Sequence, residues 1–391
     1  MTKMSEIMNI DKEYVANTYA RVPLVLTVGK GSVVYDENGR EFIDMGSGIG
    51  VNAFGFSDEL WSQAVSEQAG KLQHTSNFYY TEPAAKLAKL LCEKTGMKKV
   101  FFANSGAESN ECAIKAARKW GALNKGEEYS TIITLQKSFH GRTVTTLAAT
   151  GQDRYHEQFQ PLTPGFVHAE ANNLESVKKL LAENKVCAVM FECVQGEGGV
   201  NALDKDFVQG IAKLAQEENF LVISDEVQTG NGRTGKLYAY MNYDISPDIV
   251  TTAKGLGGGL PLGACMFGER TEGVYGAGDH GSTYGGNPVC CAGALSIISR
   301  IDDELLASVK EKSEFIVNAL KDAPGVESVS GMGLMLGVKT KKPIKEVIEI
   351  CRENGVLCIT AKEKLRLLPA LNIPMETLEK AIEVIKAAIA C

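Results

Sequence analysis

From about residue 99 onward, short apolar segments rich in β-branched residues alternate with longer amphipathic segments. The apolar segments have the length and composition of buried strands, and the segments between them have the periodicity of helices. Strands are predicted at Val100–Ala103, Thr131–Leu135, Val186–Glu192, Phe220–Ser224 and Asp248–Thr252, and helices at Ala107–Ala122, Leu174–Glu183 and Asp206–Glu218. Because such alternation produces right-handed β-α-β crossovers, we expect an α/β fold with a largely parallel sheet.

The two ends of the chain follow a different pattern. Residues 1–50 contain short strand-like runs broken by turn residues, and the region after Pro288 contains helices, then short strands, then the helix Met375–Ala390. With 391 residues the chain is long enough for more than one domain. We therefore predict a large domain at residues 51–287 and a smaller α+β domain at 288–391, with residues 1–50 joining the smaller domain.

Composition excludes several classes of partner. The formal net charge is −7, which argues against nucleic acid and anionic membranes as partners, and no apolar run is long enough to span a membrane. The first residues lack the apolar core of a secretion signal. None of the ten cysteines forms a C-x-x-C pair and the five histidines are scattered, so we expect a cytoplasmic protein without disulfides or a metal site.

Two charged residues follow two of the predicted strands. Asp225 comes directly after Phe220–Ser224, and Lys254 lies two residues beyond Asp248–Thr252. In open α/β sheets ligands bind outside the carboxyl ends of the strands, so both side chains are expected at one rim. A buried lysine can be neutral enough to form a Schiff base, and a carboxylate suits the ring nitrogen of pyridoxal phosphate. The alternative is a structural ion pair at the edge of the sheet.

A second candidate lies where Val100–Ala103 leads directly into a helix. Ser105, Gly106 and Ala107 fall at the helix N-terminus, where backbone N–H groups form an anion site. Ser105 could equally be an ordinary helix cap. No glycine-rich nucleotide loop competes with this site, so a phosphorylated cofactor is favoured over a nucleoside triphosphate.

Two further segments follow strands at the same rim. In the first, Phe139 could stack on a planar ring and Arg142 could bind a carboxylate, or they could be a core residue and a solvated charge. In the second, Glu192 and Glu197 lie among glycines, which could equally form a simple loop or bridge structurally to nearby arginines.

Taken in order, six motifs resemble the class III pyridoxal-phosphate aminotransferases, a fold-type I family, over nearly the whole chain. The motifs are NSGAE at 104–108, FHGRT at 139–143, QGEGG at 195–199, DEVQTG at 225–230, TAKG at 252–255 and GSTYGGNP at 281–288. The resemblance implies a mostly parallel seven-stranded sheet in the large domain. It also implies pyridoxal 5'-phosphate as cofactor and a homodimer with shared active sites.

The resemblance also assigns roles to residues that hold the cofactor. It implies that Lys254 forms the Schiff base and moves the substrate proton, that Asp225 pairs with the pyridinium and that Gln228 neighbours the ring hydroxyl. The phosphate would be held by the residues of the cup, which are Ser105, Gly106 and Ala107. Phe139 would stack on the ring, and Thr283 would reach the phosphate of the partner subunit.

Four residues correspond to substrate-binding positions of the family: Arg142, Glu197, Ser282 and Arg366. Arg142 and Arg366 would hold carboxylates, and Glu197 would mask Arg366 when the donor is not an α-amino acid. The opening NTYARVPLVLTVGK is most similar to members that transfer the δ-amino group of N2-acetyl-L-ornithine to 2-oxoglutarate in arginine biosynthesis.

Other readings stay open at this stage. Ornithine, succinylornithine and 4-aminobutyrate are alternative donors, because GFSD at 55–58 and LPALN at 368–372 depart from the family pattern where substrate enters. A regulatory module that binds pyridoxal phosphate without catalysis would need a DNA-binding segment, and the N-terminal region is too short and too acidic to supply one.

Overall fold

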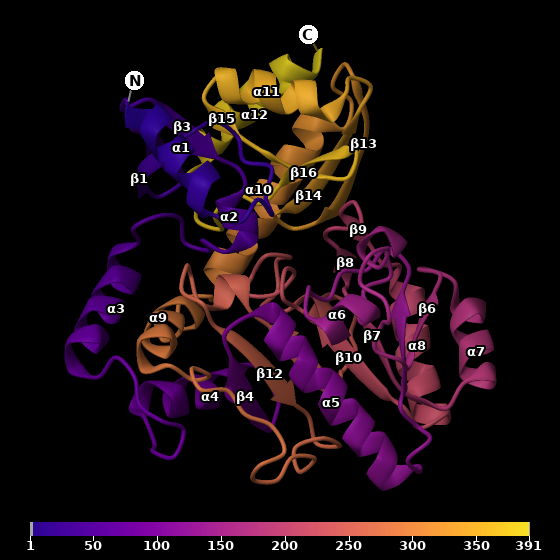
Figure 1. Ribbon diagram of the computed structural model, residues 1–391. Coiled ribbons are helices and arrows are strands. Elements are labelled where there is room, and N and C mark those ends of the chain that lie inside the picture. Colours follow the sequence, from indigo (N-terminus) through magenta and orange to yellow (C-terminus); the bar gives the residue numbers. More distant parts are fainter. Residues whose placement is uncertain (1–2, 391) are drawn as a thin grey trace.

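A seven-stranded sheet forms the centre of the larger part of the computed structural model, which describes residues 3–390 (Figure 1). Its strands in spatial order are β4 (Lys99–Ala103), β12 (Gly263–Phe267), β11 (Ile249–Thr252), β10 (Leu221–Asp225), β7 (Val186–Phe191), β5 (Thr131–Leu135) and β6 (Phe166–Ala169). Only β12 runs antiparallel to its neighbours among these seven strands. The predicted α/β fold with a mostly parallel sheet is confirmed.

Helices cover both faces of this sheet, because successive side chains of its strands point to opposite sides. One face, with Met190 and Ile223, packs against α5 (Gly106–Asn124). The other face, with Val189 and Val222, packs against α8 (Lys205–Glu217), and α7 (Leu174–Glu183) lies beside α8. Burial on both faces explains why β7 is apolar at all six positions.

The smaller part contains the C-terminal end of the described chain together with the strands of residues 26–44 (Figure 1). One four-stranded sheet has the order β1 (Leu26–Lys30), β2 (Val33–Asp36), β3 (Glu41–Asp44) and β15 (Val356–Leu357). The other has the order β13 (Val326–Met332), β14 (Met335–Thr340), β17 (Lys364–Leu367) and β16 (Ile359–Ala361). The helices α10 (Asp303–Leu320), α11 (Ile344–Glu353) and α12 (Met375–Ala390) accompany these sheets. Pairing of β3 with β15 joins the N-terminal segment to the C-terminal region, and the three-part division at 50 and 287 stays a prediction.

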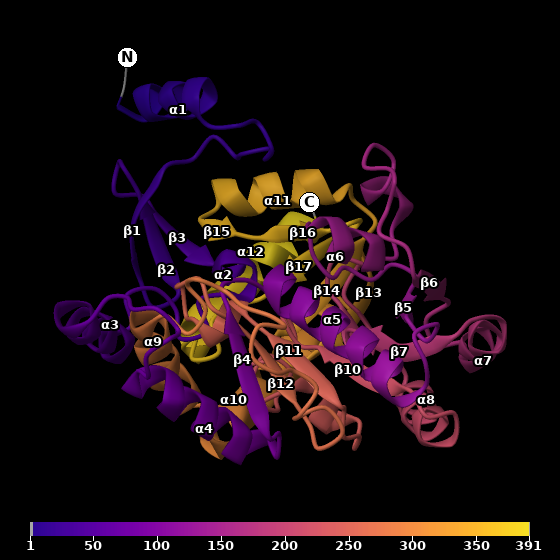
Figure 2. The same cartoon turned by 60° about the horizontal axis from the view of Figure 1, so that its bottom comes forward.

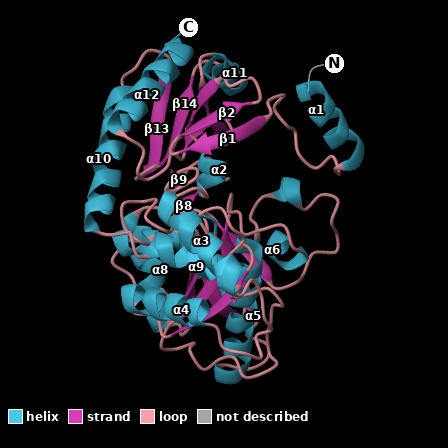
Figure 3. Cartoon of the chain, turned by 90° about the vertical axis from the view of Figure 1, so that its left-hand side faces the viewer, coloured by secondary structure: helices cyan, strands magenta, loops and turns pink. Residues whose placement is uncertain are grey.

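The remaining helices lie at the periphery. α3 (Glu59–Lys71) and α4 (Glu82–Thr95) pack against α9 (Pro288–Ile298), while α1 (Lys3–Tyr14) stands apart from both parts (Figures 2 and 3). Short elements complete the chain: α2 (Ser47–Gly50), α6 (Val144–Ala149), β8 (Val194–Gln195), β9 (Asn201–Ala202) and the 3-10 turns at Asp153–Tyr155, Ala239–Asn242 and Lys254–Leu256. Of the helices described, none combines the length and apolarity needed to cross a membrane.

Candidate active site

A cavity of about 640 Å³ lies outside the carboxyl ends of β10 and β11, at the beginning of α5. Nine of the residues singled out from the sequence line it: Ser105, Gly106, Ala107, Phe139, Arg142, Glu192, Asp225, Gln228 and Lys254. Strand register explains part of this convergence, since Asp225 pairs with Thr251 and both strands end at the same rim. The cavity therefore occupies the position where open α/β sheets bind ligands.

One end of the cavity is formed by the first turn of α5. Ser105 is the N-cap, and its Oγ accepts a hydrogen bond from the N–H of Glu108 at 3.2 Å. The N–H groups of Gly106 and Ala107 lie in the first turn, where a helix has no internal acceptor for them. A Cβ at position 106 would lie 2.5 Å from Val227, so glycine is required there. Unpaired donors and the helix dipole together make this end a cup for an anion such as phosphate.

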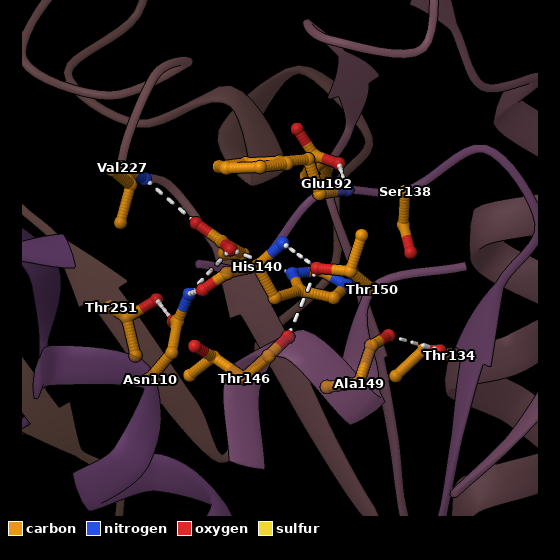
Figure 4. Close-up of polar contacts among 12 residues, drawn as sticks. Asn110, Thr134, Ser138, His140, Thr146, Ala149, Thr150, Glu192, Val227 and Thr251 are labelled. Carbon is orange, nitrogen blue, oxygen red and sulfur yellow. Dashed lines mark hydrogen bonds and ion pairs between the residues drawn. The ribbon is translucent and has the colours of Figure 1, made fainter. Parts of the chain in front are cut away.

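Asp225 is held in one orientation by three donors, which come from Asn110, His140 and Val227; Figure 4 labels these three residues. Its Oδ2 lies 2.8 Å from both Asn110 Nδ2 and His140 Nδ1, and its Oδ1 accepts the N–H of Val227 at 3.0 Å. Thr251 Oγ1 donates to Asn110 Oδ1 at 2.6 Å, which fixes the amide. A carboxylate held this way presents a fixed negative charge to the cavity. Asn110 and His140 were given no role from the sequence, although His140 lies inside the motif FHGRT and Asn110 lies two residues after NSGAE.

Lys254 follows β11 in a strained backbone conformation, with φ of +47°. Burial lowers the pKa of its amine to about 8, and the nearby Glu197 carboxylate partly opposes this effect. Asn231 fixes the turn, because its Nδ2 donates to the carbonyl of Ala253 at 3.1 Å. A substantial fraction of the amine is therefore neutral near neutral pH and available as a nucleophile.

Phe139 and Arg142 form another side of the cavity. The half-buried Phe139 donates its backbone N–H to Glu192 Oε1 at 2.8 Å. The guanidinium carbon of the exposed Arg142 lies 4.6 Å from the ring centroid of Tyr155 and 5.6 Å from that of Phe139. No carboxylate between residues 3 and 390 forms an ion pair with Arg142, so its planar fork can receive the carboxylate of a ligand.

Arg366 and Glu197 form an ion pair between the two parts of the molecule. Arg366 lies on β17 of the smaller part, and its Nη1 is 2.5 Å from Glu197 Oε1. The same nitrogen donates to Gln228 Oε1 at 3.2 Å, and Gln228 lines the cavity. Only 4% of the Arg366 side chain is exposed, against 25% of Glu197. The Gln228 side chain therefore separates Arg366 from the cavity. The charge of Arg366 is neutralised by Glu197, which is partly exposed to solvent.

Ser282 and Thr283 do not line the cavity of their own chain. Ser282 Oγ accepts hydrogen bonds from Asn104 Nδ2 and from the N–H of Gly285, each at 3.0 Å, and Thr283 is exposed. Tyr19, which precedes β1, lines the cavity although the sequence did not single it out as a site residue. Tyr19 lies in the segment NTYAR, which was used only as part of the resemblance to the family.

The groups that face the cavity fit pyridoxal phosphate. The cup at α5 suits the phosphate, Phe139 suits the ring, and the anchored Asp225 suits the ring nitrogen. Lys254 supplies an amine for the aldehyde. No group of three or more His, Cys, Asp or Glu side chains within residues 3–390 is arranged to hold a metal ion.

The family model for class-III aminotransferases matches residues 14–389. The chain belongs to the class-III aminotransferases. Members of this family use pyridoxal phosphate, which explains why the residues that line the cavity fit this cofactor.

Relatives of this class-III aminotransferase extend over its full length. It is 48% identical to the acetylornithine aminotransferase of Haemophilus ducreyi, over 97% of each chain. The acetylornithine aminotransferase structure from Elizabethkingia anophelis has a TM-score of 0.90 and 31% identity, covering 100% of this chain and 99% of that one. An ornithine aminotransferase structure from Toxoplasma gondii, with pyridoxal phosphate in partial occupancy, has a TM-score of 0.94 and 29% identity, covering 99% and 94%. These fold-type I structures agree with the expected fold.

Proposed function

We propose that this enzyme transfers the δ-amino group of N2-acetyl-L-ornithine to 2-oxoglutarate. The products would be N-acetylglutamate 5-semialdehyde and L-glutamate, and the reaction would belong to arginine biosynthesis. The ion pair between Glu197 and Arg366 beside the cavity carries the argument for a terminal-amine donor. The choice of N-acetylornithine among such donors rests on the 48% identity to the Haemophilus ducreyi enzyme.

The two substrates place opposite demands on the cavity. The donor presents a terminal amine with its carboxylate far away, whereas the acceptor carries a keto group next to a carboxylate. With Glu197 on Arg366, the cavity has one open arginine, Arg142, for the donor's distant carboxylate. When Glu197 moves toward solvent, Arg366 receives the α-carboxylate of 2-oxoglutarate and Arg142 receives the other one. Gln228 Oε1 also accepts a hydrogen bond from Arg366, at 3.2 Å, while the pair with Glu197 is closed.

Chemistry at the cavity divides between two residues, Asp225 and Lys254, and the cofactor. Pyridoxal phosphate, when bound, supplies an electron sink for negative charge on the substrate carbon. Asp225 keeps a proton on the ring nitrogen, because its fixed negative charge favours the cationic form of that nitrogen. Lys254 Nζ accepts the proton from the substrate carbon and then donates it to the cofactor. Its lowered pKa, about 8, allows the amine to do both near neutral pH.

We propose further that the enzyme is a homodimer in which Thr283 completes the partner's phosphate cup. Thr283 is exposed and lies outside its own cavity. Asn77 ties the same loop to an exposed aromatic segment, donating to the carbonyls of Ser282 and Gly285 at 2.9 and 3.0 Å. We place the dimer in the cytoplasm, a reducing compartment, because the nine described cysteines are unpaired thiols.

The donor is tested by the amino-transfer half-reaction alone. Enzyme loaded with pyridoxal phosphate is mixed with N-acetylornithine, ornithine, succinylornithine or 4-aminobutyrate, and loss of the cofactor's absorbance is followed by stopped flow. We expect the largest ratio of rate to half-saturation concentration with N-acetylornithine. A larger ratio with any other donor contradicts the proposed substrate while leaving the reaction class intact. The Lys254→Ala variant is the blank for all four donors.

A further inference from the structure

Glu192 is a buried carboxylate at the edge of the cavity, and the proposed reaction gives it no role. It follows β7 and is 6% exposed. No cation forms an ion pair with it among residues 3–390. Instead its two oxygens accept backbone donors, Oε1 from Phe139 at 2.8 Å and Oε2 from Gly196 at 3.3 Å. Figure 4 shows its contact with the segment that begins at Ser138.

These two donors belong to different functional segments. Residues 138–142, here the stacking loop, carry Phe139 and Arg142 to the cavity. Residues 195–200, here the gate loop, carry Glu197, which immediately follows Gly196. One carboxylate therefore joins the proposed ring-stacking residue to the loop that bears the acid over Arg366.

The far end of the gate loop is attached to the smaller part of the molecule. Ser330 Oγ donates to the carbonyl of Val200 at 2.8 Å, and Lys364 Nζ donates to Asn201 Oδ1 at 2.9 Å. With Glu192 holding Gly196 at the near end, both ends of the loop are fixed. The resting position of the Glu197 side chain then depends on where Glu192 holds the backbone of Gly196.

Glu226 provides a comparison, because it is equally buried but entirely local in its contacts. It is 0% exposed and accepts hydrogen bonds from Ser224, Thr229, Ala239 and Tyr240 at 3.1, 2.5, 2.9 and 2.8 Å. All four lie within residues 224–240, and the Glu226 side chain does not line the cavity. Burial raises the pKa of both acids to about 7. Glu226 is therefore a structural carboxylate matched to Glu192 in burial and charge.

We propose that Glu192 is a positioning residue that holds the stacking loop and the gate loop in a fixed relation, so that cofactor seating and donor selection depend on the same carboxylate. The part concerning donor selection rests on the proposed function. The part concerning the cofactor rests only on the family and on the contacts of Phe139.

Three variants separate this role from simple structural support. Glu192→Gln keeps the size of the side chain but replaces one acceptor by a donor, so one of the two backbone N–H groups loses its partner. Glu192→Asp keeps both acceptors on a shorter stem that cannot reach both loops. Glu226→Gln makes the same change as the first variant in a buried carboxylate that does not itself line the cavity, although its neighbours Asp225 and Val227 do.

The measurements use the holoenzyme. The circular dichroism of the bound cofactor in its visible absorption band and its dissociation constant report on the stacking loop. The ratio of half-reaction rates with N-acetylornithine and with glutamate reports on the gate loop. A buried donor that loses its partner shifts an equilibrium by about ten- to hundredfold. We therefore expect cofactor binding to be at least about tenfold weaker in both Glu192 variants. The visible dichroism should fall and the rate ratio should move toward glutamate.

Glu226→Gln should lower the melting temperature while leaving the dichroism and the rate ratio unchanged. If either soluble Glu192 variant matches wild type in dichroism, cofactor affinity and rate ratio, the proposal is wrong. It is also wrong if Glu226→Gln changes these quantities as much as the Glu192 variants do. Failure of the wild type to use N-acetylornithine would overturn the proposed donor, but the dichroism and affinity would still test Glu192.

Discussion

At the scale of single residues, the site depends on groups held in states that water would not favour. Lys254 combines a left-handed backbone, with φ of +47°, and an amine whose pKa burial lowers to about 8. Positive φ at a residue with a side chain costs about 1–3 kcal/mol and persists only where the surroundings impose it. The strain is consistent with a lysine placed for its chemistry rather than for packing.

The lowered pKa predicts how the cofactor attaches. Only the neutral amine attacks the aldehyde, and its fraction rises with pH through about 8, so the attachment rate to cofactor-free protein should rise through the same range. Stopped-flow absorbance at a series of pH values measures this. Borohydride reduction followed by peptide mass spectrometry should then locate the cofactor on Lys254. Cofactor found on another lysine, or a rate independent of pH, would contradict the assignment.

Asp225 should matter for the chemical step more than for cofactor binding. In Asp225→Ala the cup at Ser105–Ala107 remains, so cofactor can still bind, but the ring nitrogen loses its anionic partner. We expect the single-turnover rate to fall by orders of magnitude. Asp248→Asn is the matched control, because Asp248 lies at the opposite end of the sheet and accepts the N–H of Val222 at 2.8 Å. Equal effects of the two substitutions would argue that Asp225 only supports the strand.

At the scale of elements, the ion pair between Glu197 and Arg366 depends on one short strand and one loop from different parts of the molecule. β17 carries Arg366, while the loop between β8 and β9 carries Glu197. Removing one partner of a fully buried ion pair costs roughly 3–5 kcal/mol. The cost should be smaller here, because 25% of the Glu197 side chain is exposed and Arg366 keeps its bond to Gln228.

Glu197→Ala should therefore change substrate preference more than stability. Arg366 becomes available at all times, so the half-reaction of glutamate's α-amino group should accelerate and that of the terminal amine should slow. Stopped-flow measurement of the two half-reactions decides this. Glu327→Ala on β13 removes an exposed ion pair to Lys339, 2.9 Å long, and should alter neither half-reaction. Equal slowing of both half-reactions in Glu197→Ala would mean that the pair is only structural.

The sequence predicts elements well where their signal is local. Thr131–Leu135, Leu174–Glu183 and Met375–Ala390 agree with the structure at both ends, because apolar periodicity alone defines them. β6, β12 and β17 were missed. β12 begins with glycine and contains no β-branched residue, and it becomes a strand because β4 and β11 pair with it on either side.

The same distinction explains which site residues the sequence could reveal. Lys254 and Asp225 stand directly after apolar strands, so each has a local signal. Asn110 contacts Asp225, 115 positions away. Glu192 was singled out because it follows an apolar strand, but its contact with Phe139, 53 positions away, was not predicted. Such contacts exist only after the sheet has formed, and a single sequence contains no trace of them.

At the scale of the whole molecule, one exposed region suggests that a single chain is incomplete. Phe78 and Tyr80 are 93% and 104% exposed, and Tyr284 is 62% exposed. Asn77 connects their segment to the loop that contains Ser282 and Thr283. Exposed aromatic residues gathered next to functional residues are typical of protein–protein interfaces. In the proposed dimer this region is the contact surface, and Thr283 contributes to the partner's cavity.

Subunit complementation tests this arrangement. If each site combines Lys254 of one chain with Thr283 of the other, Lys254→Ala and Thr283→Ala chains are each inactive alone. A heterodimer of the two contains one site with both substitutions and one site with neither. After denaturation and joint refolding of equal amounts, half of the dimers are mixed, so activity should return to about one quarter of the wild-type value. Native mass spectrometry verifies the mixed dimers, and each variant refolded alone gives the background. Verified mixed dimers without activity would show that each site is built from one chain.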